Sequence, residues 1–206
     1  MKMKPFIVGF EGVDGSGKTT QVRLLEEKLK SLGYSVRNIK ETEDTYLGKL
    51  ASGMEDRRDN WQRYLTFLAS KSELAEVLSH CSEDFVLLDR FTPSMFAYAP
   101  SKVVQDSALH YAVRRLLKKG IRFPKVHVCV LMRSSYGDYL LRRSIGNTLS
   151  EEEFSEIDRL YRRATHGCAV WKLEVNTSVT TVEKTHELIA DYVLKQHRKG
   201  DESCQQ

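Results

Sequence analysis

The chain has 206 residues, 41% of them hydrophobic, which is enough to bury one core of ordinary size. Its 32 lysines and arginines exceed its 28 acidic residues by only four, and no basic block favours nucleic acid or a membrane as a partner. Composition therefore excludes disordered and fibrous chains. No apolar run approaches the roughly 18 residues that cross a bilayer, and the amino terminus lacks a secretory signal, so we expect a cytosolic protein.

Five apolar runs rich in β-branched residues alternate with segments of helical length. The runs cover residues 6–10, 36–39, 85–88, 126–132 and 170–175. This alternation is typical of an α/β fold, here a five-stranded parallel sheet flanked by helices. We expect one domain over residues 1–197, with a short lid at about 142–152 before a helix capped by Ser150, and a disordered tail over 198–206.

A phosphate-binding loop follows the first predicted strand and precedes a helix. Residues 12–19 match the complete pattern G-x-x-x-x-G-K-[ST], which predicts a P-loop NTPase fold that binds a nucleoside triphosphate. The loop backbone cradles phosphates, Lys18 supplies a positive charge, and Thr19 offers a hydroxyl to Mg²⁺. The residues expected to bind ATP are Gly12, Asp14, Gly15, Ser16, Gly17, Lys18, Thr19 and Thr20.

Charged residues end two other predicted strands, at the edge where open α/β sheets bind ligands. Asp89 and Arg90 follow the third strand: Asp89 is expected to bind Mg²⁺ together with Thr19, and Arg90 suits a second phosphate. A surface ion pair at a strand end is the alternative reading, which the upstream phosphate loop makes less favourable. Lys40 ends the second strand at the same edge.

The helix predicted from about residue 61 to 78 places Phe67 and Lys71 on one face. An aromatic plane beside a hydrogen-bond donor is what a nucleobase needs. A core Phe67 covered by the stem of Lys71 fits the periodicity almost equally well, and both readings stay open.

Two segments together resemble the thymidylate kinase family of nucleoside monophosphate kinases. Residues 10–21 resemble the family's P-loop, and Asp89-Arg90-Phe91 with Ser94, Ala97 and Tyr98 is similar to its D-R-[YH]-x-x-S-x-x-A-[YF] segment. The resemblance covers most of the chain. It implies transfer of the γ-phosphoryl group of ATP to dTMP, with Mg²⁺, by a homodimer that acts on small nucleotides.

The resemblance also implies roles for single residues. Arg90 is expected to hold the acceptor phosphate, Tyr98 to crowd the sugar, Asp14 to lie near that sugar, and Phe67 to stack on the thymine. Substrate contacts are therefore expected at Asp14, Lys40, Phe67, Lys71, Arg90, Ser94 and Tyr98.

Several residues depart from the family pattern. Lys40 and Lys71 stand where the family has arginines, at the acceptor phosphate and at the base, and Met95 replaces a polar group found in some relatives. A lysine keeps the charge but loses the bidentate geometry of arginine, so base selection is expected to be looser.

The P-loop contains no arginine, which resembles the subgroup whose catalytic arginine comes from the lid. Arg142 and Arg143 match that position, and we expect Arg143 to act with Lys18, Arg90 and Asp14 in catalysis. Arg159 and Tyr161 resemble the helix that returns from the lid.

Two other classes of function remain possible. A deoxynucleoside kinase, or another nucleoside monophosphate kinase, would use the same loop, and the former would need a carboxylate base such as Glu41. A nucleotide-binding switch should carry an N-K-x-D guanine motif, which the sequence lacks.

Overall fold

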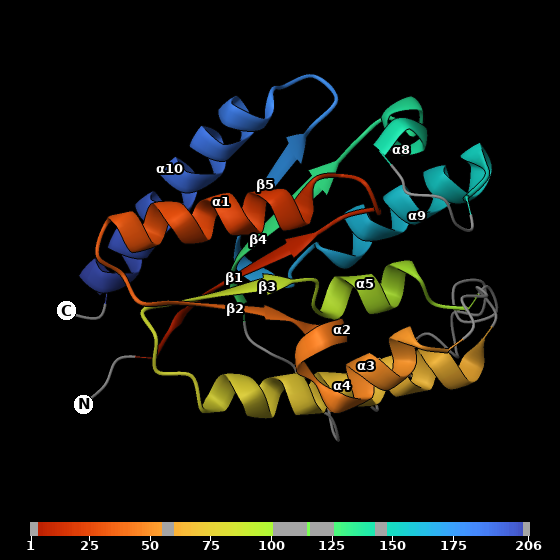
Figure 1. Cartoon of the computed structure of the whole chain (residues 1–206), viewed down its shortest axis with the longest axis horizontal. Helices are drawn as coiled ribbons and strands as arrows, with labels where there is room; N and C mark the ends of the chain where they lie inside the picture. Colours follow the sequence, from red (N-terminus) through yellow and green to blue (C-terminus); the bar gives the residue numbers. More distant parts are fainter. Residues whose placement is uncertain (1–3, 55–59, 101–114, 116–125, 143–147, 204–206) are drawn as a thin grey trace.

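The computed structural model describes residues 4–54, 60–100, 115, 126–142 and 148–203. A parallel sheet of five strands in the order β2-β3-β1-β4-β5 runs through it (Figure 1). The strands are β1 (Phe6–Glu11), β2 (Val36–Lys40), β3 (Phe85–Asp89), β4 (Val126–Arg133) and β5 (Ala169–Asn176). All five predicted strands are confirmed, with ends shifted by at most one residue.

Helices cover both faces of the sheet. They are α1 (Lys18–Ser31), α2 (Glu41–Asp44), α3 (Tyr46–Ser52), α4 (Trp61–Ser79), α5 (Thr92–Ala97), α8 (Tyr136–Arg142), α9 (Glu151–Ala164) and α10 (Val182–Ser203). One core lies between the sheet and the pair α1 and α10, and a second lies between the sheet and α4 (Figure 1). The described chain is thus a three-layer α/β structure.

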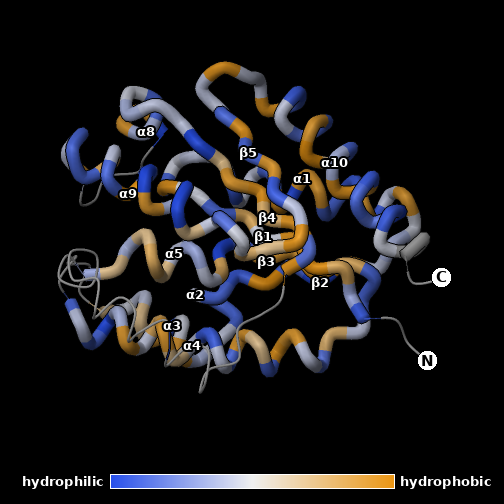
Figure 2. The backbone as a smooth tube through the Cα atoms, turned by 180° about the vertical axis from the view of Figure 1, so that it is seen from behind, coloured by the Kyte–Doolittle hydropathy of each residue, from blue (hydrophilic) through white to orange (hydrophobic). Residues whose placement is uncertain are grey.

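The central strand β1 positions the site because it lies between β3 and β4 and is buried along its whole length. Strands covered on both faces are apolar throughout, and Figure 2 shows the hydrophobic strands in the middle of the molecule. The register pairs Phe10 with Asp89 and Lys40 with Asp89, so β1, β2 and β3 end at the same edge. Polar residues that follow these strands are therefore brought together there.

The predicted cap of α9 is confirmed. The Ser150 hydroxyl accepts a hydrogen bond from the Glu153 backbone N–H at 3.2 Å, and the Glu153 carboxylate accepts one from Ser150 N–H at 2.9 Å. Of the predicted lid, residues 143–147 lie outside the described residues, whereas 151 and 152 already belong to α9.

The carboxyl-terminal helix is longer than predicted. α10 continues to Ser203, so residues 198–203 are helical where a disordered tail was expected. The His197 ring lies 4.6 Å from the Phe85 ring, centroid to centroid, and 5.6 Å from that of Tyr34, which anchors the last turns of the helix on the core. Among the described helices none has the length and hydropathy needed to span a bilayer.

Gly9 of β1 is in close contact with the ring of Phe91, the residue that directly follows Arg90. The Phe91 ring packs against Gly9, where an added Cβ would come within 2.6 Å of the ring carbon Cδ1. We predict that Gly9→Ala destabilises the protein by about 1–3 kcal/mol, because the buried Phe91 ring must move. Urea denaturation measures this change. Gly53→Ala is the control: its Cβ would make ordinary contacts, and its stability should be unchanged or slightly higher. Equal effects of the two substitutions would contradict the packing account.

Candidate functional site

The phosphate loop joins β1 to α1 and depends on glycine at three positions. Gly12, Gly15 and Gly17 have φ values of 139°, 73° and 88°, which side chains disfavour. At Gly12 a Cβ would also collide with the Met132 carbonyl oxygen of β4. The loop therefore has the conformation that its sequence pattern requires.

Lys18 begins α1 and turns its ammonium group onto the loop. Nζ donates to the Val13 carbonyl oxygen at 2.7 Å and lies 3.4 Å from the Ser16 hydroxyl. The side chain is almost fully buried, and burial together with the positive charge of Arg90 lowers its pKa to about 7. An anion bound beside this group would favour its charged form.

The side chains of Thr19 and Asp89 are in contact next to the phosphate loop. The Thr19 hydroxyl donates to Asp89 Oδ2 at 2.6 Å, and Asp89, the last residue of β3, is buried. Both side chains offer the oxygen atoms that magnesium prefers. No group of three or more His, Cys, Asp and Glu side chains that could hold a metal occurs in the described part of the chain.

Arg90 has an unusual backbone. Its φ is 74°, and it is the one residue other than glycine with positive φ in the described ranges. The conformation is held by a hydrogen bond from Arg90 N–H to the Phe10 carbonyl oxygen at 3.0 Å and by the Phe91 N–H, which donates to Glu11 at 2.8 Å. Strained backbone of this kind is common where a functional side chain must be aimed.

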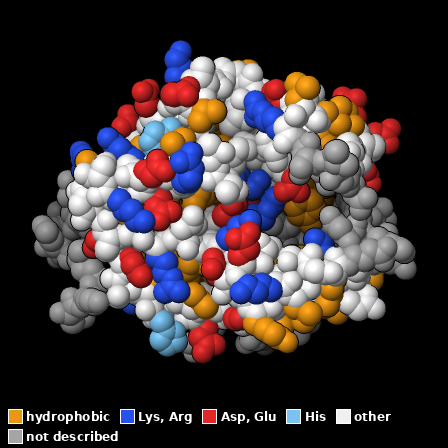
Figure 3. Space-filling view, viewed as in Figure 1, with side chains coloured by type: hydrophobic (Ala, Val, Ile, Leu, Met, Phe, Trp, Pro, Cys, Tyr) orange, Lys and Arg blue, Asp and Glu red, His pale blue; other side chains and the backbone are white. Residues whose placement is uncertain are grey.

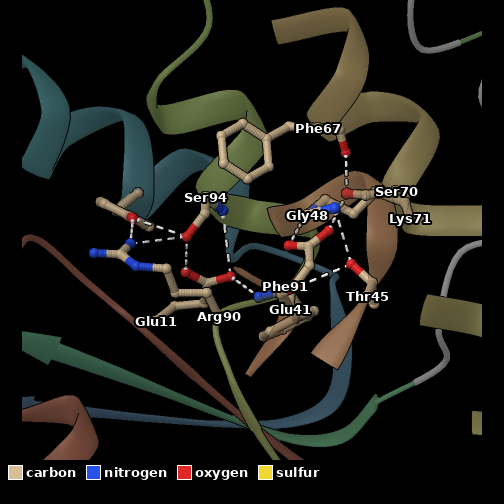
Figure 4. A network of polar contacts seen from close by, with 11 residues as sticks. Glu11, Glu41, Thr45, Gly48, Phe67, Ser70, Lys71, Arg90, Phe91 and Ser94 are labelled. Carbon is tan, nitrogen blue, oxygen red and sulfur yellow. Dashed lines mark hydrogen bonds and ion pairs between the residues drawn. The ribbon is translucent and has the colours of Figure 1, made fainter. Parts of the chain in front are cut away.

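The guanidinium group of Arg90 joins the phosphate loop to α5 and α9. Nη1 donates to the Gly12 carbonyl oxygen at 3.2 Å, to the Ser94 hydroxyl at 3.0 Å and to the Tyr161 hydroxyl at 2.5 Å, while Nη2 pairs with Asp14. Figure 4 shows the part of this network formed by Arg90, Ser94 and Glu11. Arg90 thus lies where the nucleotide loop meets its neighbouring helices.

A second buried cluster lies at the start of α2. The Lys71 ammonium and the Ser70 hydroxyl both bind the Glu41 carboxylate, and Lys71 and Glu41 are 1% and 3% exposed (Figure 4). Lys71 therefore reaches the region where the sequence predicted it, but its charge is already paired with Glu41.

Lys40 lies elsewhere than expected for a substrate contact. Its ammonium pairs with Glu43, and it does not line the cavity described below. The reason is the alternation of side chains along β2, which turns Ile39 into the core and Lys40 to the other side. The structure therefore places Lys40 outside the cavity, and its role as a phosphate clamp stays a prediction.

A cavity of about 210 Å³ lies beside the phosphate loop. Figure 3 shows a hollow that exposes hydrophobic side chains beside crowded acidic and basic ones. Six of the seven predicted substrate contacts line the cavity: Asp14 comes from the loop, Phe67 and Lys71 from α4, Ser94 from α5, and Arg90 and Tyr98 from the segments on either side of α5. The lining residues are Asp14, Glu41, Thr42, Asn60, Arg63, Tyr64, Phe67, Lys71, Arg90, Ser94, Met95 and Tyr98.

Asn60 and Arg63 line the cavity but were not singled out from the sequence. Arg63 Cζ lies 5.2 Å from the centroid of the Phe67 ring, and its Nε donates to the Ala51 carbonyl oxygen at 3.2 Å. Asn60 caps α4, and its Oδ1 accepts a hydrogen bond from Arg63 N–H at 3.0 Å. The helical spacing of Arg63, Phe67 and Lys71 places them on one face of α4, a signal that could have found Arg63.

Tyr98 and Tyr161 flank Arg90. Arg90 Cζ lies 5.6 Å from the Tyr98 ring centroid, and burial raises the pKa of Tyr98 to about 12. Tyr161, on α9, is fully buried, whereas Arg159 on the same helix is exposed.

Of the two lid arginines, Arg143 lies outside the described residues. A Cβ added to Gly15 would lie 3.5 Å from the Cβ of Arg142. The end of α8 therefore lies over the phosphate loop. Its guanidinium group, however, donates to the Thr177 hydroxyl at 3.0 Å and to the Thr177 carbonyl oxygen at 3.1 Å.

The buried pair of Glu41 and Lys71 leads to a stability prediction. Lys71→Met should cost about 3 kcal/mol, because it leaves the Glu41 carboxylate buried beside an apolar group. Adding Glu41→Gln should restore most of this loss, since no buried charge then remains. Urea denaturation of the single and double variants measures both effects. Lys30→Met, which removes an exposed partner of Glu26, is the control and should change stability by less than about 0.5 kcal/mol. A double variant as unstable as Lys71→Met would contradict the account.

Comparisons with known proteins identify the family of this chain. The family model for thymidylate kinase matches residues 10–189. The thymidylate kinase of Pelotomaculum thermopropionicum is 32% identical over 173 residues, which cover 80% of this chain and 79% of that protein. A second relative, from Thermosipho africanus, is 44% identical over 98 residues; the match spans 44% of this chain and about half (49%) of that protein.

Solved structures show the same fold. Thymidylate kinase from Candida albicans superposes with a TM-score of 0.73 at 18% identity and covers 94% of both chains. That from Ehrlichia chaffeensis superposes with a TM-score of 0.66 at 19% identity, covering 93% of this chain and all of the other. The predicted P-loop NTPase fold is confirmed, and the match to the family model over most of its length shows that the chain belongs to the thymidylate kinase family.

Proposed function

We propose that this protein transfers the γ-phosphoryl group of ATP to a deoxynucleoside monophosphate, dTMP, and forms dTDP. The observation that carries the proposal is the position of Arg90, whose guanidinium group contacts Gly12 of the phosphate loop and also lines the adjoining cavity. Two anionic groups bound on either side of this cation would meet with their repulsion reduced. Membership of the thymidylate kinase family supports dTMP as the acceptor.

The phosphate loop is the proposed site for ATP. Its backbone and Lys18 would bind the donor phosphates, with Ser16 and Thr20 beside them. Thr19 and Asp89 would hold Mg²⁺, because their oxygens converge at hydrogen-bond distance and are ligands of the required kind. When bound, the ion would neutralise phosphate charge.

The cavity is the proposed site for the acceptor nucleotide. Arg90 would bind its phosphate, Phe67 would stack on the base, and Asp14, Ser94 and Tyr98 would surround the sugar and phosphate. A monophosphate oxygen is already anionic near neutral pH, since its second pKa is about 6, so the transfer needs no general base. Positioning and charge neutralisation then carry the reaction.

The state of Glu41 argues against a deoxynucleoside kinase. That reaction benefits from a carboxylate that takes a proton from a hydroxyl acceptor. The Glu41 carboxylate is instead buried, and both of its oxygens are already bound by Lys71 and Ser70, so neither is placed to take a proton from an acceptor hydroxyl.

A lid arginine is the remaining part of the proposed machinery. Arg142 at the end of α8 lies over Gly15, which supports a lid near the donor phosphates. We propose that the neighbouring Arg143 is the catalytic arginine. A homodimer is also part of the proposal and follows from the family resemblance, whereas the expected cytosolic location follows from the sequence. Light scattering after size-exclusion chromatography tests the dimer.

The experiment is ADP release from ATP and Mg²⁺ with dTMP, dUMP, dCMP, dGMP, AMP and thymidine as acceptors. We expect dTMP to stimulate release most strongly. Thymidine as the preferred acceptor would contradict the proposal, and so would slow hydrolysis that no acceptor stimulates.

Arg90→Ala tests the role proposed for Arg90 between the phosphate loop and the cavity. We expect kcat/KM for dTMP to fall by a factor on the order of 10³ or more, since the cation between the two phosphates is lost. Arg23→Ala removes an arginine from an exposed pair with Glu27 on α1 and should leave the rate unchanged. Near-normal turnover by folded Arg90→Ala would refute the assignment.

A further inference from the structure

Glu11 is a fully buried carboxylate that the proposed reaction does not use. It ends β1 and directly precedes the phosphate loop. Oε1 accepts hydrogen bonds from the backbone N–H groups of Phe91 at 2.8 Å and Ser94 at 3.2 Å, and Oε2 accepts the Ser94 hydroxyl at 2.5 Å (Figure 4). All three bonds come from the short segment that follows Arg90.

The burial of this charge is costly. Burial raises the pKa of the Glu11 carboxyl, whereas the charge of Arg90 and the bonds from Ser94 and Phe91 oppose that rise. Apolar residues of similar volume often serve stability as well as a buried ion does. An acid at this position therefore needs a reason beyond packing.

The contacts of Glu11 reach Arg90 by two routes. Phe91 N–H, bound to Glu11, fixes the chain immediately after the strained φ of Arg90. The Ser94 hydroxyl donates to Glu11 and accepts from Arg90 Nη1 at 3.0 Å, so the carboxylate also orients the partner of the guanidinium group. Glu11 itself does not line the cavity.

We propose that Glu11 is a positioning residue for the acceptor phosphate, which acts through Ser94 and the Phe91 backbone to hold the guanidinium group of Arg90 in place. It contacts neither nucleotide. The inference rests on the proposed function, because it assigns the same acceptor site. Since Glu11 is covalently joined to Gly12, a single residue fixes the acceptor clamp relative to the donor loop.

Glu11→Gln is the informative variant, because it keeps the shape of the side chain and one carbonyl oxygen. The new amide nitrogen cannot accept the Ser94 hydroxyl, so that hydroxyl must turn and Arg90 loses its fixed partner. We expect KM for dTMP to rise about tenfold, since small displacements of a positioning group have effects of this size or larger. KM for ATP should stay within about a factor of two, because the donor loop is unchanged.

Asp84→Asn is the matched control. The Asp84 carboxylate also accepts a backbone N–H and a serine hydroxyl, both from Ser35 at 2.7 Å, but at the opposite edge of the sheet. Both KM values should match those of the wild type. In a Ser94→Ala background, Glu11→Gln should raise KM for dTMP less than it does alone, since the same connection is already broken.

Glu11→Asp keeps the proposal testable if Glu11→Gln does not fold. It retains the charge but withdraws the carboxylate by one methylene, and it should raise KM for dTMP selectively, by less than Glu11→Gln. A folded variant in which both KM values are unchanged, or rise equally, would overturn the positioning role alone. A wild-type protein without dTMP-dependent ADP release would overturn the proposed function instead.

Discussion

The placement of one cation, Arg90, is the constraint on which the site depends. Its backbone has a left-handed conformation that costs on the order of 1 kcal/mol or more for such a residue, so the neighbouring structure must hold it. The Phe10 carbonyl and the Glu11 carboxylate do so from β1, the strand that also leads into the phosphate loop. The order of the strands makes this possible, because β1 and β3 are neighbours and end at the same level.

Three carboxylates at this edge of the sheet are buried, and each has a partner that offsets the cost of burial. Glu11 is bound by the start of α5, Asp89 by Thr19, and Glu41 by Lys71 and Ser70. Dipoles and charges fixed in this way need little reorganisation when charge moves between two phosphates. The same arrangement explains why both stability and transfer are expected to respond to single substitutions at this edge of the sheet.

The sequence predicted the features that depend on local pattern. The strands follow from apolar runs, the cap of α9 from Ser150 and Glu153, and the phosphate loop from its glycines. Side-chain direction was harder to predict. The placement of Lys40 depends on the face of β2 that it occupies. The pairing of Lys71 depends on a contact with Glu41 of α2, which is 30 residues away in the sequence. Arg63 was missed because helical spacing alone does not say which face of α4 meets a cavity. Glu11 lies within the P-loop resemblance, but its partners Phe91 and Ser94 come from a distant segment that the pattern does not reveal.

The most direct measurement is a crystal structure with dTMP, Mg²⁺ and a non-hydrolysable ATP analogue bound together. The account predicts that the guanidinium group of Arg90 contacts the dTMP phosphate, with the triphosphate in the loop of residues 12–19 and both phosphates on facing sides of Arg90. An acceptor phosphate bound away from Arg90, with that side chain still bound to Asp14 and Tyr161, would contradict it.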